Sequence, residues 1–153
     1  MLHTLTSSRP MASDVALLVL RLSVAAVFIA HGWSDVFEAG VATNVENYRE
    51  AGIPLAALSA PFAAYVQLIG GALVVIGALT RLVSLGFVVV MAGALIFVHM
   101  GEGLVMGQDG SGSGFAFIMG TASIALFLLG PGRYSLDGVL TARQVPQPVG
   151  NQR

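Results

Sequence analysis

Two histidines, His31 and His99, each stand at the end of a long apolar stretch and have a carboxylate close by. Asp35 follows His31 by four residues, and Glu102 follows His99 by three. An imidazole titrates near neutral pH, so it can accept or donate a proton at a quinone oxygen. Gln67, in an intervening apolar stretch, adds a hydrogen-bonding group. These five residues are the candidates for a polar, quinone-type site.

The same residue types fit three other interpretations. Two histidines with a carboxylate can hold a divalent metal, and two histidines on different helices can ligate a haem. The plainest alternative is that each histidine is an interfacial polar residue with ordinary hydrogen bonds. No ligand set here is diagnostic, so the sequence assigns no metal site and leaves the cofactor open, with a quinone among the candidates.

Four apolar stretches must position these side chains, and they predict transmembrane helices over residues 15–33, 62–79, 82–100 and 115–130. A soluble domain is about 25% charged, whereas this chain is 10% charged and 56% hydrophobic, with a mean hydropathy of +0.83. So few polar side chains cannot cover a surface that faces water around four such helices. The sequence therefore predicts an all-α integral membrane four-helix bundle in the lipid bilayer.

The arginines predict the orientation of this bundle, because the chain has no lysine. Apart from Arg21 within the first helix, only Arg49 lies on one side, and five lie on the other: Arg9, Arg81, Arg133, Arg143 and Arg153. The excess of positive charge marks the cytoplasmic side. Both termini and the turn between the second and third helices are thus expected in the cytoplasm. The two histidines then share the outer half with Gln67.

Other polar and small residues at membrane depth have structural interpretations beside functional ones. Arg21 either reaches the inner headgroups or pairs within the protein, or it contacts an anion in the bundle. Four glycines recur at seven-residue spacing on the second and third helices and favour close helix packing: Gly70, Gly77, Gly86 and Gly93. The two helices are expected to join through Thr80-Arg81 alone, and Pro61 is expected to open the second helix.

Several classes of function are excluded or disfavoured by composition. The chain has no cysteine, which rules out thiol chemistry, a disulfide and an iron–sulfur cluster within it. The net charge of −1 gives no sign of nucleic-acid binding. At 153 residues the chain has no room for a separate soluble catalytic domain, so we expect one membrane domain over 15–140, a polar lead over 1–14 and a disordered tail over 141–153.

An ordered set of short motifs resembles the DoxX family over about residues 15–140. The set comprises Leu20-Arg21-Leu22, Phe28, Ala30-His31-Gly32, Gly52-Ile53-Pro54, Gly70-Gly71, the run Ile76-Gly77-Ala78-Leu79-Thr80-Arg81, His99, and the run Gly130-Pro131-Gly132-Arg133-Tyr134-Ser135-Leu136-Asp137. The closing run is the strongest single match, and the order of the set is more specific than any one piece.

The resemblance implies a small multi-pass protein of the bacterial inner membrane, associated with quinol oxidase, thiosulfate:quinone oxidoreductase or oxidative-stress complexes. Relatives often carry a lysine where this chain has Asp35, and a glutamate where it has Gln67. Glutamine keeps the hydrogen bonding but cannot relay a proton. We therefore expect an accessory or quinone-interacting subunit of a membrane redox complex. The alternatives are a non-enzymatic scaffold or assembly subunit and, third, a small transporter. Turnover, partner subunits and homo-oligomerisation stay open.

Overall fold

The structure is a computed structural model that describes residues 10–107 and 111–144, and the described residues form helices and connecting turns without a strand. The first three helical units are α1 (Pro10–Trp33) with the π-helical turn η1 (Ser34–Glu38), then α2 (Val41–Glu50), then α3 (Ala56–Tyr65), η2 (Val66–Gly70) and α4 (Gly71–Ile76) in one continuous helix. The remaining units are α5 (Thr80–Gly93) with η3 (Ala94–Val98), α6 (Gly114–Leu129) and α7 (Leu136–Gln144).

Three of these continuous helices are long and apolar enough to cross a membrane: Met11–Glu38, Ala56–Ile76 and Thr80–Val98. The fourth apolar helix, α6, has only 16 residues, or about 24 Å at 1.5 Å per residue. Many large apolar side chains stay exposed on the outside of these helices. Contact of such a surface with lipid chains is favourable, whereas its contact with water is unfavourable. The all-helical membrane fold that the sequence predicts is therefore confirmed.

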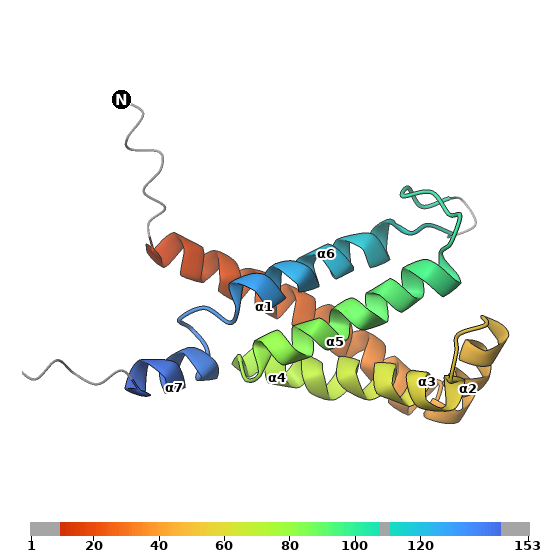
Figure 1. Ribbon diagram of the computed structural model, residues 1–153, viewed down its shortest axis with the longest axis horizontal. Helices are drawn as coiled ribbons and strands as arrows, with labels where there is room; N and C mark the ends of the chain where they lie inside the picture. Colours follow the sequence, from red (N-terminus) through yellow and green to blue (C-terminus); the bar gives the residue numbers. More distant parts are fainter. Residues whose placement is uncertain (1–9, 108–110, 145–153) are drawn as a thin grey trace, which may run out of the picture.

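The helices pack as neighbouring pairs, with α1 against the α3–η2–α4 helix and α5 against α6 (Figure 1). The rings of Phe28 and Phe87 stack at the centre with their centroids 3.8 Å apart. Around them lie the other buried apolar side chains of the core: Val24, Ala25, Val74, Met91, Ala116, Met119 and Leu126. This core therefore joins α1, α4, α5 and α6.

The two ends of the bundle differ in what they carry. Figure 1 shows the start of α1, the turn between α4 and α5, and α7 at one end, with α2 and the segment before α6 at the other. The arginine pattern predicts the first end to be cytoplasmic, and the side of the membrane on which each end lies stays a prediction.

The helix boundaries differ from the sequence expectations at the second helix. It begins at Ala56 and includes Pro61, rather than opening at that proline. Ser59 donates its hydroxyl hydrogen bond toward the carbonyls of Pro54 and Leu55 in this first turn, at 3.1 and 3.2 Å. Pro61 is the sixth residue of this helix and has no N–H to donate to the carbonyl of Ala57, so the helix lacks one backbone hydrogen bond there.

The turn between the second and third helices is also longer than Thr80-Arg81. The helix ends at Ile76 because Gly77 and Leu79 both adopt the left-handed backbone conformation, with φ of 72° and 51°. The third helix starts at Thr80. At the other end of the chain, residues 141–144 complete α7, and the rest of the expected tail, like residues 1–9 of the expected lead, lies outside the described residues.

Candidate functional site

A cavity of about 480 Å³ lies where α2, α3 and the π-helical turns meet. We call it the polar cavity, because five of its lining side chains carry polar groups: His31, Asp35, Tyr48, Ser59 and Gln67. The rest of the lining is apolar and includes Phe62, Met91, Ile96 and Phe97. A mostly apolar space of this size with a few converging polar groups is the usual form of a small-molecule site.

π-helical turns supply much of this lining. Asp35 lies in η1, Gln67 in η2, and Ala94, Ile96, Phe97 and Val98 in η3, and all of them line the polar cavity. A π-helical turn inserts one extra residue into a helix and so changes the direction in which the following side chains point. Such turns are frequent at functional sites, and here they re-aim side chains from three helices toward one space.

Asp35 is the centre of the polar contacts. Its carboxylate Oδ2 accepts a hydrogen bond of 3.3 Å from the side-chain amide of Gln67. Its backbone carbonyl accepts one of 2.9 Å from the side-chain amide of Asn44. These two bonds fix η1 against both η2 and α2.

His31 lies one helical turn before Asp35 and lines the same cavity. Its Nδ1 is 2.9 Å from the carbonyl oxygen of Val27. A carbonyl can only accept, so Nδ1 carries the hydrogen, and the neutral ring presents Nε2 as an acceptor. The ring stacks on Phe115 of α6, with centroids 5.6 Å apart. These contacts fix the tautomer and the orientation of the His31 ring.

Tyr48 and Asn44 are members of this site that the sequence-based reasoning missed. They lie four residues apart, and therefore on one face of α2, which folds back over the cavity. Burial raises the pKa of Tyr48, and the nearby Asp35 carboxylate raises it further. The phenol therefore stays protonated and is a hydrogen-bond donor. The spacing of Asn44 and Tyr48 at i and i+4 in α2 was the sequence signal that could have identified them.

His99 and Glu102 do not join the other three candidates. Nδ1 of His99 bonds to Glu102 Oε2 at 2.7 Å, and the same oxygen accepts the backbone N–H of Gly112 at 2.7 Å. Neither residue is among those that line the polar cavity. The pair instead fixes the segment that leads into α6. Within the described residues, no group of three or more acidic or histidine side chains is placed to hold a metal ion.

Arg21 is buried at the opposite end of the bundle, with only 2% of its surface exposed. Its Nη1 and Nη2 donate hydrogen bonds of 2.5 Å to the carbonyls of Pro131 and Tyr134. Of the arrangements expected for this residue, pairing within the protein is therefore the one seen. We call this region, made of Arg21, the turn 77–80 and the segment 130–137, the Arg21 junction.

Asp137 completes the Arg21 junction. Its two carboxylate oxygens accept the backbone N–H groups of Leu79 and Thr80, each at 3.1 Å, and so cap the start of α5. Its own N–H donates to the carbonyl of Gly77 at 3.0 Å. Three motifs from the sequence, those around Arg21, Gly77 and Asp137, thus meet at one point and hold four helices together.

The predicted packing glycines have three different surroundings. A Cβ on Gly70 would lie 2.7 Å from Val83, and one on Gly86 would lie 2.9 Å from Val66, so these two glycines let α5 approach the second helix. A Cβ on Gly77 would meet Ser135 at 2.4 Å, within the Arg21 junction. One on Gly93 would meet nothing within 4 Å, and Gly93 lines the polar cavity instead.

The closest helix approaches involve glycines outside the predicted set. A Cβ on Gly32 would lie 2.4 Å from the backbone nitrogen of Leu68, and one on Gly71 would lie 2.6 Å from Ile29. These two positions bring α1 against η2 and α4. Since Gly70, Gly77 and Gly86 all have their close neighbours within this chain, a larger residue there would disturb the protein's own fold before any partner surface.

Comparison with known proteins agrees with the motifs. The model of the DoxX family matches residues 16–100, a range that contains His31, Asp35, Gln67 and His99. A protein of Bacillus subtilis (strain 168) named "Putative oxidoreductase CatD" is 31% identical over 124 residues, which are 81% of this chain and 86% of that protein. No solved structure matches the chain significantly. On the match to the family model, which spans more than half of its length, the chain belongs to the DoxX family.

Proposed function

We propose that the protein binds the headgroup of a quinone in the polar cavity and acts as the quinone-interacting subunit of a membrane redox complex. The observation that carries this proposal is the convergence of His31, Asp35 and Gln67, from two different helices, on one largely apolar cavity of about 480 Å³. In the same proposal the protein is a multi-pass protein of the bacterial inner membrane, with the cavity in the outer half.

The polar side chains match the chemistry of a quinone ring. The ring has two carbonyl oxygens that accept hydrogen bonds, and the Tyr48 phenol is a donor held in its protonated form. The His31 ring accepts from a quinol hydroxyl when neutral, and donates to a quinone oxygen when protonated. The Asp35 carboxylate, which lines the same cavity, is a further acceptor. The apolar wall around these groups would exclude water from the ring.

In this proposal the electrons come from, or go to, a partner protein. Reduction of a quinone to a quinol takes two electrons and two protons, and the side chains of this cavity handle protons and hydrogen bonds only. We therefore infer that an oxidoreductase subunit supplies or removes the electrons. The relative from Bacillus subtilis carries the word oxidoreductase in its name, which supports a redox setting. Gln67 cannot carry a proton, so that role falls to His31 and Asp35.

The test is a titration of purified protein in detergent with a short-chain quinone, read from the fluorescence of the single tryptophan, Trp33, which lies on α1 between His31 and Asp35. We expect saturable quenching in the wild type and a dissociation constant about tenfold higher in His31→Ala and in Asp35→Asn, since each removes a bond worth about 1.4 kcal/mol. Equal dissociation constants in all three proteins would contradict the proposal. The scaffold and transporter alternatives stay hypotheses.

A further inference from the structure

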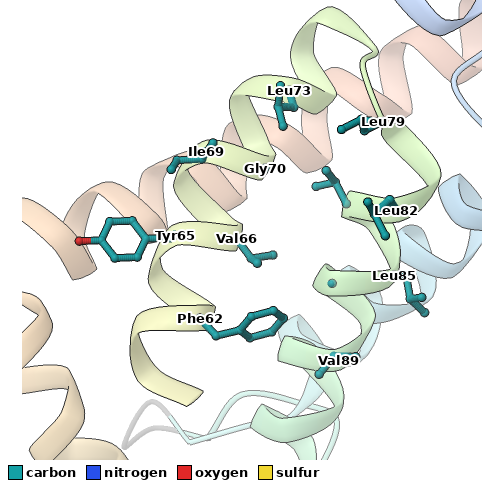
Figure 2. Close-up of a pocket in the computed structure, with 12 residues that line it drawn as sticks. Phe62, Tyr65, Val66, Ile69, Gly70, Leu73, Leu79, Leu82, Leu85 and Val89 are labelled. Atoms are coloured by element: carbon teal, nitrogen blue, oxygen red, sulfur yellow. The ribbon is translucent and has the colours of Figure 1, made fainter. Parts of the chain in front are cut away.

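A second space, distinct from the polar cavity, runs between the α3–η2–α4 helix and α5. We call it the apolar groove, and its volume is about 540 Å³. Its lining is apolar apart from the hydroxyl of Tyr65, which Figure 2 shows pointing away from the groove. In the same view Phe62 and Val66 point across the groove toward α5. No group in this lining could bind a charged or strongly polar ligand.

The groove and the polar cavity adjoin. Phe62 and Val89 line both spaces. Figure 2 shows these two residues at one end of the groove, with Leu73 and Leu79 at the other end. From Phe62 to Leu73 the helix advances by about 16 Å at 1.5 Å per residue. The two spaces therefore form a polar compartment with an extended apolar continuation.

We propose that the apolar groove binds the isoprenoid chain of the quinone whose ring occupies the polar cavity. This inference rests on the proposed function. The uncharged polar ring of such a quinone matches the polar cavity, and its long apolar chain matches the adjoining apolar groove. A phospholipid fits less well, because its phosphate needs a cationic partner. The residues that line the two spaces include no arginine or lysine, and their one histidine, His31, lies one helical turn from the Asp35 carboxylate, which would repel a phosphate.

The expected gain in affinity from the chain is modest. A chain that moves from lipid or detergent into the groove leaves one apolar medium for another, so only packing favours the groove. We expect a prenylated quinone to bind about threefold to tenfold more tightly than the same ring without a chain. The position of the chain is the sharper observable.

The experiment uses the full-length protein and a quinone that carries a photoreactive diazirine at the end of its prenyl chain. After irradiation, mass spectrometry locates the labelled residues. We expect labels on groove residues near Leu73, Leu79 and Leu82, and we expect an excess of the chain-free ring to abolish them, because the ring anchors the molecule. Labels spread over the outer surfaces of all helices would overturn the inference. If the chain-free ring does not displace the groove labels, any lipid chain can occupy the groove, and this result would overturn the inference as well.

A pair of variants tests the groove independently. Ile69 lines the groove and is 56% exposed, whereas Ile76 is 54% exposed and is not among the lining residues. Ile69→Trp should remove the advantage of the prenylated quinone and leave the affinity of the chain-free ring unchanged, and Ile76→Trp should change neither. If the prenylated quinone still binds more tightly than the chain-free ring in Ile69→Trp, the assignment of the groove is contradicted, but the proposed function is not. Absence of saturable binding of the chain-free ring to the wild type contradicts the proposed function instead.

Discussion

The Arg21 junction and the polar cavity both bury polar side chains at membrane depth, at opposite ends of the bundle, but their partners differ. At the junction, Arg21 and Asp137 bond to backbone groups of the segment 130–137 and the turn 77–80. At the cavity, Asp35 and Gln67 bond to each other and still face an open space. A costly intramembrane polar group is therefore structural where the protein itself supplies its partners. It is a candidate for ligand binding where, as at the polar cavity, an open space remains beside the bonded polar groups.

The largest expected effect breaks the junction. Arg21→Met keeps much of the side-chain volume but leaves the carbonyls of Pro131 and Tyr134 without their charged donor. We expect a loss of about 3 kcal/mol in the free energy of unfolding, since each unpaired carbonyl costs about 1–3 kcal/mol. Unfolding in a denaturing detergent, followed by circular dichroism, measures this loss. The fraction that stays folded should bind quinone as the wild type does. A stability within about 0.5 kcal/mol of the wild type would show that the junction does not hold the helices together.

A smaller effect is expected in the cavity from Tyr48→Phe. The change removes one hydroxyl donor, so the quinone dissociation constant should rise by about threefold to tenfold, in line with about 0.5–1.5 kcal/mol for a hydrogen bond. Because burial and the Asp35 carboxylate raise the pKa of Tyr48, the donor is present at all pH values below the ordinary tyrosine value of about 10. The ratio of variant to wild-type affinity should thus be constant from about pH 6 to about pH 9. A ratio that rises toward one as the pH rises within that range would contradict this assignment.

The smallest expected effect separates the two histidines. His99→Ala breaks the bond to Glu102 in the segment before α6, outside the polar cavity. Quinone affinity should stay within about twofold of the wild type, while His31→Ala weakens it about tenfold. The fluorescence titration of Trp33 measures both. An equal loss in the two variants would restore the two-histidine site that the sequence alone suggested.

Much of the fold could be predicted from the sequence, because apolar stretches and glycine turns act locally. Gly52, in the Gly52-Ile53-Pro54 motif, ends α2 with a φ of 71°: the N–H of Ile53 bonds to the carbonyl of Tyr48 and that of Gly52 to the carbonyl of Arg49. This is the glycine cap of a Schellman motif. The DoxX family was also identified correctly from the ordered motifs.

The grouping of the site was predicted only in part. Matching depth along the membrane brought together all five candidates, but depth does not determine the direction in which a side chain points. The π-helical turns turn Asp35 and Gln67 toward the cavity, and nothing in the sequence marks such turns. Glu102 lies close enough in sequence to bond His99 itself. The contribution of Tyr48 depends on how α2 folds back over α3, which is a tertiary contact rather than a local pattern.

The most direct test of the central claim fills the polar cavity without disturbing the fold. Gly93 lines the cavity, and a Cβ there meets nothing within 4 Å, so Gly93→Leu places its side chain in the space proposed for the quinone ring. Its neighbour Ala92 is exposed and lies outside the lining, which makes Ala92→Leu the matched control. We predict that Gly93→Leu weakens quinone binding at least about tenfold, with stability equal to or above that of the wild type because leucine favours the helix over glycine. Ala92→Leu should bind as the wild type does. Wild-type affinity in a folded Gly93→Leu variant would contradict the assignment of this cavity as the ligand site.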